Sequence, residues 1–149
     1  MLLKEICTTD VVFCGRETSA LEAARIMRTK HIGDLVVVDD PADECAPVGL
    51  VTDRDIVVKV LGAELDPAAT AVGTIMRTPL VTARDSEDTS VAIARMRASG
   101  VRRLPVTGHG GTLVGIVTLD DLLKLVAAGA NALLDIVAKE QDYERRAYR

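Results

Sequence analysis

Two short stretches, 49-GLVTDRD-55 and 115-GIVTLDD-121, share the motif G-h-h-T-x-x-D, in which h is an apolar residue. They lie 66 residues apart in a chain of 149 residues. Each follows a second matching stretch, 27-MRTKHIGDLVVVD-39 in the first half and 96-MRASGVRRLPVTG-108 in the second, at an offset of 69 residues. Matches at fixed spacing are typical of internal repeats. The chain therefore consists largely of two copies of one unit in the same order.

A third pair of matching stretches, 6-ICTTDVV-12 and 75-IMRTPLV-81, has the same 69-residue offset. The offset shortens by three residues where 40-DPADECAPV-48 is replaced by 109-HGGTLV-114. Both of these stretches are rich in Pro, Asp or Gly, which favour turns, and a change in the length of a turn costs little. The two copies are therefore expected to differ in a turn and to share their helices and strands.

The repeated unit has the pattern β-α-β-β-α. Apolar residues at three- and four-residue spacing predict its first helix. Ser19 and Glu22 resemble a capping box at the start of that helix, and Gly100 is placed to end its counterpart. Short β-prone entries are expected at 11–13 and 80–82, and first helices at 19–30 and 88–99. The expected strands are 34–38, 48–52, 103–107 and 113–118, and the helices after the motif are 53–62 and 119–128.

The organisation of the chain follows from this pattern. One copy, of about 55 residues, is too small to bury both faces of its sheet, so the two copies should pair about a pseudo-twofold axis. The predicted fold class is α+β, with a first domain at 6–63 and a second at 74–130. A linker with Gly, Pro and Gly punctuation joins them at 62–73. The tail, 131–149, begins apolar and ends charged, and is expected to be a helix with one stripe packed on the module or on a second subunit.

Composition excludes several classes of protein. Hydrophobic residues make up 48% of the chain, enough for a sizeable core, and the net charge is −4. The three aromatic residues and the absence of a basic block argue against nucleic-acid binding. No apolar run has the ~18–20 residues of a membrane span, and early acidic residues argue against a signal peptide. Three cysteines without CxxC spacing indicate a reduced, cytoplasmic protein.

The repeated Thr and Asp have two interpretations. A Thr at the N-cap with an acid three residues later forms a capping box, which needs no ligand. Alternatively, the carboxylate accepts hydrogen bonds from both hydroxyls of a ribose, while the Thr hydroxyl and the helix N-terminus hold a phosphate. Neither His31 nor His109 belongs to a cluster with metal-ligand spacing, and no serine has a setting typical of a catalytic triad, so we expect neither a metal site nor a catalytic residue.

The tandem units ending in 49-GLVTDRD-55 and 115-GIVTLDD-121, with 101-VRRLPVT-107 before the second, resemble a pair of CBS (cystathionine-β-synthase-type) domains, called a Bateman module. The resemblance extends from about Ile6 to about Ala128. It implies a non-catalytic sensor that binds AMP, ADP or ATP, or in some members NAD or S-adenosylmethionine, in clefts between the repeats. It also implies no required cofactor. The nucleotide-binding residues matched by the resemblance are Thr52, Asp55, Arg102, Arg103, Leu104, Pro105, Thr118 and Asp121.

The two clefts are expected to be unequal. Arg102 and Arg103 match basic residues that meet phosphate in the family, whereas Gly33 and Asp34 occupy the same positions in the first copy. We therefore predict that the second copy combines Asp121 with both arginines and forms the stronger site. A solvated or ion-paired strand face is the alternative for the arginines. Asp34 is expected to be a surface acid at the end of a turn.

The resemblance also implies a homodimer, in which two modules form a flat disc and signal to a separate, unidentified regulated protein. The expected interface consists of apolar residues on the helices after each motif: Ile56, Val57, Val60, Leu61, Leu122, Leu123, Leu125 and Val126. Two other functions are considered. One is a structural subunit with empty clefts. The other is a nucleotide-processing enzyme, for which the sequence offers no recognisable general base.

Overall fold

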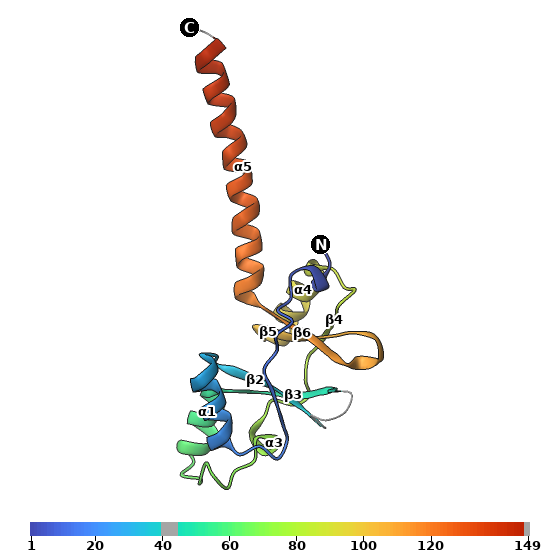
Figure 1. Cartoon of the computed structure of the whole chain (residues 1–149), viewed down its shortest axis with the longest axis vertical. Helices are drawn as coiled ribbons and strands as arrows, with labels where there is room; N and C mark the ends of the chain where they lie inside the picture. Colours follow the sequence, from blue (N-terminus) through green and yellow to red (C-terminus); the bar gives the residue numbers. More distant parts are fainter. Residues whose placement is uncertain (40–44, 148–149) are drawn as a thin grey trace.

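The computed structural model describes residues 1–39 and 45–147 and contains two small three-stranded sheets, one from each half of the chain (Figure 1). In each sheet the first strand is parallel to the second, and the third is antiparallel to the second. The first half contains η1 (Leu3–Glu5), β1 (Phe13–Gly15), α1 (Ala20–Lys30), β2 (Asp34–Val38), β3 (Pro47–Thr52), α2 (Asp53–Ile56) and η2 (Val57–Leu61). The second half contains α3 (Val72–Ile75), β4 (Ala83–Arg84), α4 (Thr89–Ser99), β5 (Arg103–Thr107), η3 (His109–Gly111), β6 (Leu113–Thr118) and α5 (Leu119–Ala147).

The α+β fold class and the repeat are confirmed by the register of the two sheets. Asp34 pairs with Thr52 in the first sheet, and the equivalent Arg103 pairs with Thr118 in the second. The four central strands have the predicted extents to within one residue. The entry strands β1 and β4 begin two to three residues after the predicted 11–13 and 80–82. Part of the predicted turn 40–48 lies outside the described residues, and its counterpart forms the short turn η3.

The predicted boundaries of the first helix of each repeat hold to within one residue, whereas the predicted end at 128 is wrong because α5 continues to Ala147. The Ser19 hydroxyl accepts a hydrogen bond from the Glu22 N–H at 3.1 Å, as the N-cap of α1. Gly100 ends α4 with a left-handed backbone (φ 62°), a conformation that glycine adopts without strain. His31 ends α1 in the same conformation, at the repeat-equivalent position. Local sequence therefore decides where these helices start and stop.

The core has three parts. One apolar cluster fills the first repeat between α1 and its sheet, and a second fills the equivalent space in the second repeat. A third joins the repeats: Val36, Val38 and Leu50 of the first sheet pack against residues that include Leu113 and Ile116 of the second. The two sheets therefore bury their inner faces against each other, which makes the pair a single module.

Each sheet is completed by a segment that the sequence assigns to the other repeat. Thr8 exchanges two backbone hydrogen bonds of 2.9 Å with Ile116 of β6, and Leu3 is fully buried in the second core. In the equivalent arrangement, the Arg77 N–H donates to the Leu50 carbonyl of β3 at 2.8 Å. The repeats thus exchange their leading segments, an arrangement that the order of the sequence does not reveal.

The glycine that opens each motif permits this exchange. A Cβ added to Gly49 would collide with the Met76 side chain, 2.8 Å from its Cγ. A Cβ added to Gly115 would lie 2.6 Å from the Cys7 sulfur. Met76 and Cys7 are themselves repeat-equivalent, so both glycines are required by the same close approach of a crossing segment.

The helices after the motifs differ between the repeats. In the first repeat, α2 continues as the π-helical turn η2 and ends at Leu61. In the second, α5 continues for 29 residues and carries the tail away from the module (Figure 1). The prediction that the tail is helical is confirmed, but packing of an apolar stripe on its own module is wrong, because Leu133, Leu134, Ile136 and Val137 are exposed. No helix in the described part of the chain is long and apolar enough to span a bilayer.

Candidate nucleotide-binding site

A pocket of about 550 Å³ lies between the two repeats. Its first-repeat wall comes from the end of β3 and the start of the following helix, and its second-repeat wall comes from the end of α4 and the start of β5. The leading segment of the second repeat, with Arg77, Leu80 and Val81, closes a third side. The described residues that line the pocket are Leu50, Thr52, Asp53, Arg54, Asp55, Val58, Lys59, Arg77, Leu80, Val81, Gly100, Val101, Arg102 and Arg103.

The first motif forms a capping box at the edge of this pocket. The Thr52 hydroxyl accepts from the Asp55 N–H at 3.1 Å and donates to Asp55 Oδ2 at 2.9 Å. The Thr52 N–H donates to the same oxygen at 3.0 Å, and Lys59 Nζ lies 2.9 Å from Oδ1. Burial alone would raise the pKa of Asp55, but the hydrogen bonds from Lys59 and Thr52 outweigh burial and hold that pKa below its usual range. Asp55 is therefore an ionised acceptor at the pocket wall.

The second motif has nearly the same local geometry. The Thr118 hydroxyl donates to Asp121 Oδ2 at 2.6 Å, and the Thr118 N–H donates to the same oxygen at 3.0 Å. Its cation is more distant, with Lys124 Nζ 4.0 Å from Asp121 Oδ1. Neither Thr118 nor Asp121 lines the pocket described above. Both motifs thus form the capping box that the sequence predicts, but only the first contributes to this pocket.

The structure corrects the expected grouping of the site residues. Arg102 and Arg103 were expected to act with Asp121 of their own repeat, but they line the same pocket as Asp55 and Thr52 of the other repeat. The reason is the pseudo-twofold arrangement, which faces the start of β5 toward the start of α2. The cleft that combines an acid of the motif with both arginines is therefore formed by residues from two repeats.

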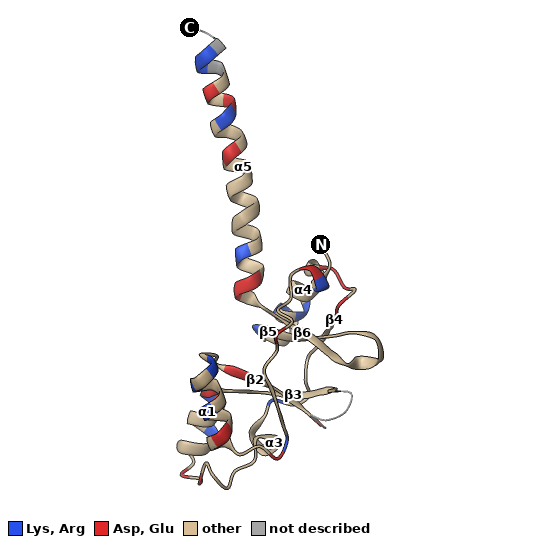
Figure 2. Cartoon of the chain, viewed as in Figure 1, with Lys and Arg blue, Asp and Glu red and all other residues tan. Residues whose placement is uncertain are grey.

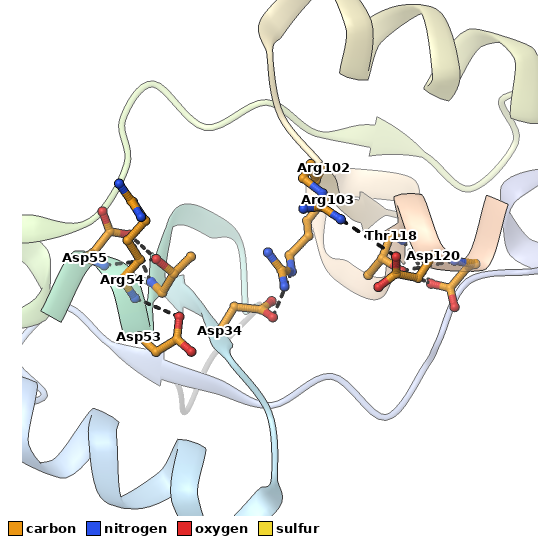
Figure 3. A network of polar contacts seen from close by, with 10 residues as sticks. Asp34, Asp53, Arg54, Asp55, Arg102, Arg103, Thr118 and Asp120 are labelled. Atoms are coloured by element: carbon orange, nitrogen blue, oxygen red, sulfur yellow. Dashed lines mark hydrogen bonds and ion pairs between the residues drawn. The ribbon is translucent and has the colours of Figure 1, made fainter. Parts of the chain in front are cut away.

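An ion pair joins the repeats beside the pocket, between Asp34 and Arg103 (Figure 3). Arg103 Nε lies 3.0 Å from Asp34 Oδ1, and the Asp34 side chain is 16% exposed. Burial raises the pKa of Asp34, Arg103 lowers it, and nearby Asp53 raises it, with a net upward shift. Asp34 is therefore a half-buried partner of Arg103, and its assignment as a surface acid is wrong.

Three other candidate residues have different environments. The Arg102 side chain is 72% exposed, and its nearest carboxylate is Asp120 at 3.9 Å. Leu104 and Pro105 are almost completely buried and do not line the pocket, so their side chains contribute to the core. The apolar lining comes from aliphatic residues outside the predicted binding set: Leu50, Val58, Leu80, Val81 and Val101.

Two further arginines, Arg54 and Arg77, were also missed as site residues. Neither has an ion-pair partner within residues 1–39 and 45–147. Arg54 stands inside the first motif, so its position next to Asp55 was an available signal. Arg77 enters only because the leading segment of the second repeat crosses to β3.

The charge of this pocket is not repeated in the second copy. Five cationic side chains line it against two carboxylates: Arg54, Lys59, Arg77, Arg102 and Arg103 against Asp53 and Asp55. The repeat-equivalent positions hold three carboxylates and no cation. The five cations correspond to Asp120, Leu125, Thr8, Gly33 and Asp34, and the two carboxylates correspond to Leu119 and Asp121. Opposite charge at equivalent positions makes the first of these environments suited to an anion and the second unsuited to one.

Among the described residues, no group of three or more His, Cys, Asp or Glu side chains is arranged to hold a metal ion. Within the described lining, the pocket has no His, Cys or Ser side chain. Its hydroxyl groups are limited to that of Thr52, which is engaged with Asp55. The lining therefore provides acceptors, cations and aliphatic surface.

Comparison with curated proteins finds relatives of similar sequence. The chain is 35% identical over 121 residues to the uncharacterised protein MK0525 of Methanopyrus kandleri, covering 81% of this chain and 60% of that protein. It is 31% identical over 134 residues to an uncharacterised 17.7 kDa protein of Acidianus ambivalens, covering 90% and 74%. It is 29% identical over 116 residues to inosine-5'-monophosphate dehydrogenase of Mycobacterium tuberculosis, covering 78% of this chain and 20% of the enzyme. The chain thus spans less than two thirds of the length of the first and third of these proteins.

Solved structures with the same arrangement include hypoxic response protein I, described with two coordinated zinc ions. It has a TM-score of 0.74 and 31% identity, covering 83% of this chain and 98% of that one. The CBS domain pair of protein MJ0100, in complex with 5'-methylthioadenosine and S-adenosyl-L-methionine, has a TM-score of 0.75 and 26% identity, covering 87% and 98%. The family model for the CBS domain matches this chain twice, at residues 3–62 and 72–128. The chain therefore belongs to the CBS domain family and contains a pair of CBS repeats.

Proposed function

We propose that this CBS pair is a non-catalytic regulatory module that binds a phosphate-bearing adenine nucleotide, AMP, ADP or ATP, in the pocket between Asp55 and Arg103. The observation that carries the proposal is the combination of five cationic side chains, one ionised motif carboxylate and an aliphatic lining in a single pocket of about 550 Å³. That volume lies within the usual range for small-molecule sites. The structural similarity to a CBS pair described with two adenosine-containing ligands supports the adenine assignment.

The proposed roles follow from the chemistry of the lining. Asp55 accepts hydrogen bonds from ribose hydroxyls, because an ionised carboxylate forms strong, charge-assisted bonds. The aliphatic residues provide a flat apolar surface for the base. The phosphate is held by arginines, whose planar guanidinium groups suit its oxygens. Arg54, Arg77 and Arg102 carry this role first, because Arg103 already has a carboxylate partner in Asp34.

The ligand state would be passed to a separate regulated protein. The module has no required cofactor in this proposal and acts in the cytoplasm as a homodimer. The first repeat is assigned to residues 6–63, the second to 74–130, and the tail to 131–149. NAD remains a candidate because it also carries phosphate and adenine. S-adenosylmethionine is disfavoured by its cationic sulfonium, which would meet the five cationic side chains of the pocket.

A thermal-shift panel of AMP, ADP, ATP, NAD, S-adenosylmethionine and adenosine tests the proposal. A ligand at 100 times its dissociation constant adds ~2.7 kcal/mol to the free energy of unfolding. Phosphate-bearing nucleotides are expected to stabilise the protein more than adenosine does, and chromatography should recover each nucleotide unchanged. No shift with any adenine ligand would favour a structural subunit instead, and turnover of a nucleotide would favour an enzyme.

A further inference from the structure

Asp34 and Arg103 occupy equivalent positions in the two repeats. Asp34 is the first residue of β2 and pairs with Thr52 in the first sheet, whereas Arg103 is the first residue of β5 and pairs with Thr118 in the second. The same two residues form an ion pair, with Arg103 Nε 3.0 Å from Asp34 Oδ1. Residues that are related by a twofold rotation and also contact each other must lie beside its axis. The ion pair therefore stands on the pseudo-twofold axis, and Figure 3 shows it between the two motifs.

This ion pair exists because the two repeats differ. Identical repeats would place like charges opposite each other at the axis, whereas Figure 2 shows an acidic residue at the start of β2 and a basic one at the start of β5. Within residues 1–39 and 45–147, it is the ion pair that joins a strand of one sheet to a strand of the other, and neither residue has a second ion-pair partner there. Asp34 and Arg103 therefore compensate each other's charge.

Asp34 needs this partner more than Arg103 does. The Asp34 side chain is 16% exposed, against 37% for Arg103. Burial and the nearby carboxylate of Asp53 both raise the pKa of Asp34, so both disfavour its negative charge. Removing the cation from such a pair leaves an uncompensated charge in a half-buried position, which is unfavourable. A ligand that takes Arg103 must therefore also offset the loss to Asp34.

Arg103 has a second possible partner, because it lines the proposed nucleotide pocket and Asp34 does not. A phosphate monoester carries about −1.5 to −2 elementary charges at neutral pH and has three strong acceptor oxygens. Arg54 and Arg77 have no ion-pair partner in the described chain, so they can meet a phosphate without breaking another contact. Arg103 has to leave Asp34 first. Adenosine, which has no phosphate, gives Arg103 no reason to leave.

We propose that Asp34 is a specificity-determining residue of the nucleotide pocket, because its carboxylate competes with the phosphate of the ligand for Arg103. Binding of a phosphate-bearing nucleotide opens the ion pair on the axis, and binding of adenosine leaves it closed. Opening the pair weakens nucleotide binding and limits the advantage of the nucleotide over the nucleoside. Asp34 acts through Arg103 and is thus a positioning residue. The proposal rests on the proposed function, since it requires a phosphate-bearing nucleotide in this pocket.

The first test is calorimetric titration of AMP and adenosine into the wild type, Asp34→Asn, Arg103→Gln and the double variant. Asparagine keeps the shape of the side chain and removes its charge. Asp34→Asn is expected to tighten AMP binding about two- to fivefold, the range for a partly exposed ion pair, and to leave adenosine binding unchanged. When Arg103→Gln is already present, Asp34→Asn should have no effect on AMP, because no guanidinium group is left to release.

Asp120→Asn is the matched control. Its carboxylate lies 3.9 Å from Arg102, and both side chains are at least 70% exposed, so its removal should leave AMP binding unchanged. A gain in AMP affinity that persists with Arg103→Gln, or that Asp120→Asn reproduces, would assign the effect to net charge and overturn the proposal. An equal gain for adenosine would overturn it as well. Unchanged AMP binding in Asp34→Asn would contradict this inference alone, whereas a wild type that binds no AMP would contradict the proposed function itself.

The second test observes the opening of the pair by carboxyl NMR at constant pH. The signal of the Asp34 carboxyl carbon is identified by its absence in Asp34→Asn. AMP should move this signal in the wild type, because the carboxylate loses its partner, and adenosine should not. In Arg103→Gln the partner is already absent, so AMP should leave the signal in place. A signal that AMP does not move in the wild type, or moves equally in Arg103→Gln, would overturn the proposal.

Discussion

Removal of the motif carboxylate provides a matched pair of variants, Asp55→Ala and Asp121→Ala. Each carboxylate accepts from the N–H and the hydroxyl of its own N-cap threonine, with distances of 2.6 to 3.0 Å. Loss of such a cap costs about 0.5–2 kcal/mol of stability. Because the two capping boxes are equivalent, the two variants should lose similar amounts of stability.

Their effects on AMP binding should differ. Only Asp55 lines the pocket that contains Arg54, Arg77, Arg102 and Arg103. Loss of a hydrogen bond to a charged group costs ~1.5–3 kcal/mol, which corresponds to a roughly ten- to hundredfold loss of affinity. Asp55→Ala is expected to show that loss, and Asp121→Ala is expected to retain nearly wild-type affinity.

Isothermal titration calorimetry with AMP measures the affinities, and thermal unfolding of the same samples measures the stabilities. Comparable Tm values with unequal affinities would assign the ribose contact to Asp55. An equal loss of affinity in both variants, or a larger loss in Asp121→Ala, would refute the assignment of the site to the cross-repeat pocket. The direction of this prediction is opposite to the one that the sequence supports, so the experiment distinguishes them.

Three further predictions concern the charges and the close contacts of the module. Replacing Arg102 and Arg103 by Gln should reduce the affinity for AMP more than that for adenosine and flatten the salt dependence of AMP binding. Parallel losses of affinity for both ligands would rule out a phosphate-binding role for the two arginines. Arg97→Gln on α4 is the control. Arg103→Gln should raise the pKa of Asp34 further, because burial and Asp53 remain while the attractive charge is lost. When the pKa of a carboxyl is higher in the folded than in the unfolded state, stability falls as the pH rises from the unfolded-state pKa to the folded-state pKa. The Arg103→Gln variant should therefore lose additional stability in that pH interval. Carboxyl NMR titration measures the pKa of Asp34, and Arg102→Gln should leave that pKa unchanged. Gly49→Ala should destabilise the protein by about 1–3 kcal/mol through collision with Met76, and an additional Met76→Ala change should recover part of that loss, whereas strict additivity in denaturant unfolding would contradict the contact.

The local features of the fold were predictable because they depend on neighbouring residues. The helix starts at Ser19 and Asp88, the left-handed end at Gly100 and the four central strands follow from capping chemistry and from runs of alternating or apolar residues. The capping boxes at Thr52 and Thr118 were predictable for the same reason, since both partners lie within one turn of helix. The entry strands shifted because their position depends on pairing with β2 and β5 and not on their own weak β propensity.

The candidate site was only half predictable. The sequence identified Thr52, Asp55, Arg102 and Arg103, but it grouped the arginines with the motif of their own repeat. It also offered no sign that Arg77 would reach the pocket, or that Asp34 and Arg103 would meet. Each of these contacts joins residues that are far apart in the chain, and the repeat pattern is compatible with contacts within a repeat as well as between repeats.

The sequence by itself determined that this protein has two copies of a β-α-β-β-α unit, because repeats, apolar spacing and caps are recorded in consecutive residues. The tertiary structure alone decided that the leading segments cross to the opposite sheet and that one pocket gathers cations from both repeats. It also decided that α5 projects from the module with its apolar surface exposed. The physical reason is that burial and charge act between elements brought together by the pseudo-twofold packing, and that packing is fixed by the joint core around Val36, Leu50 and Ile116.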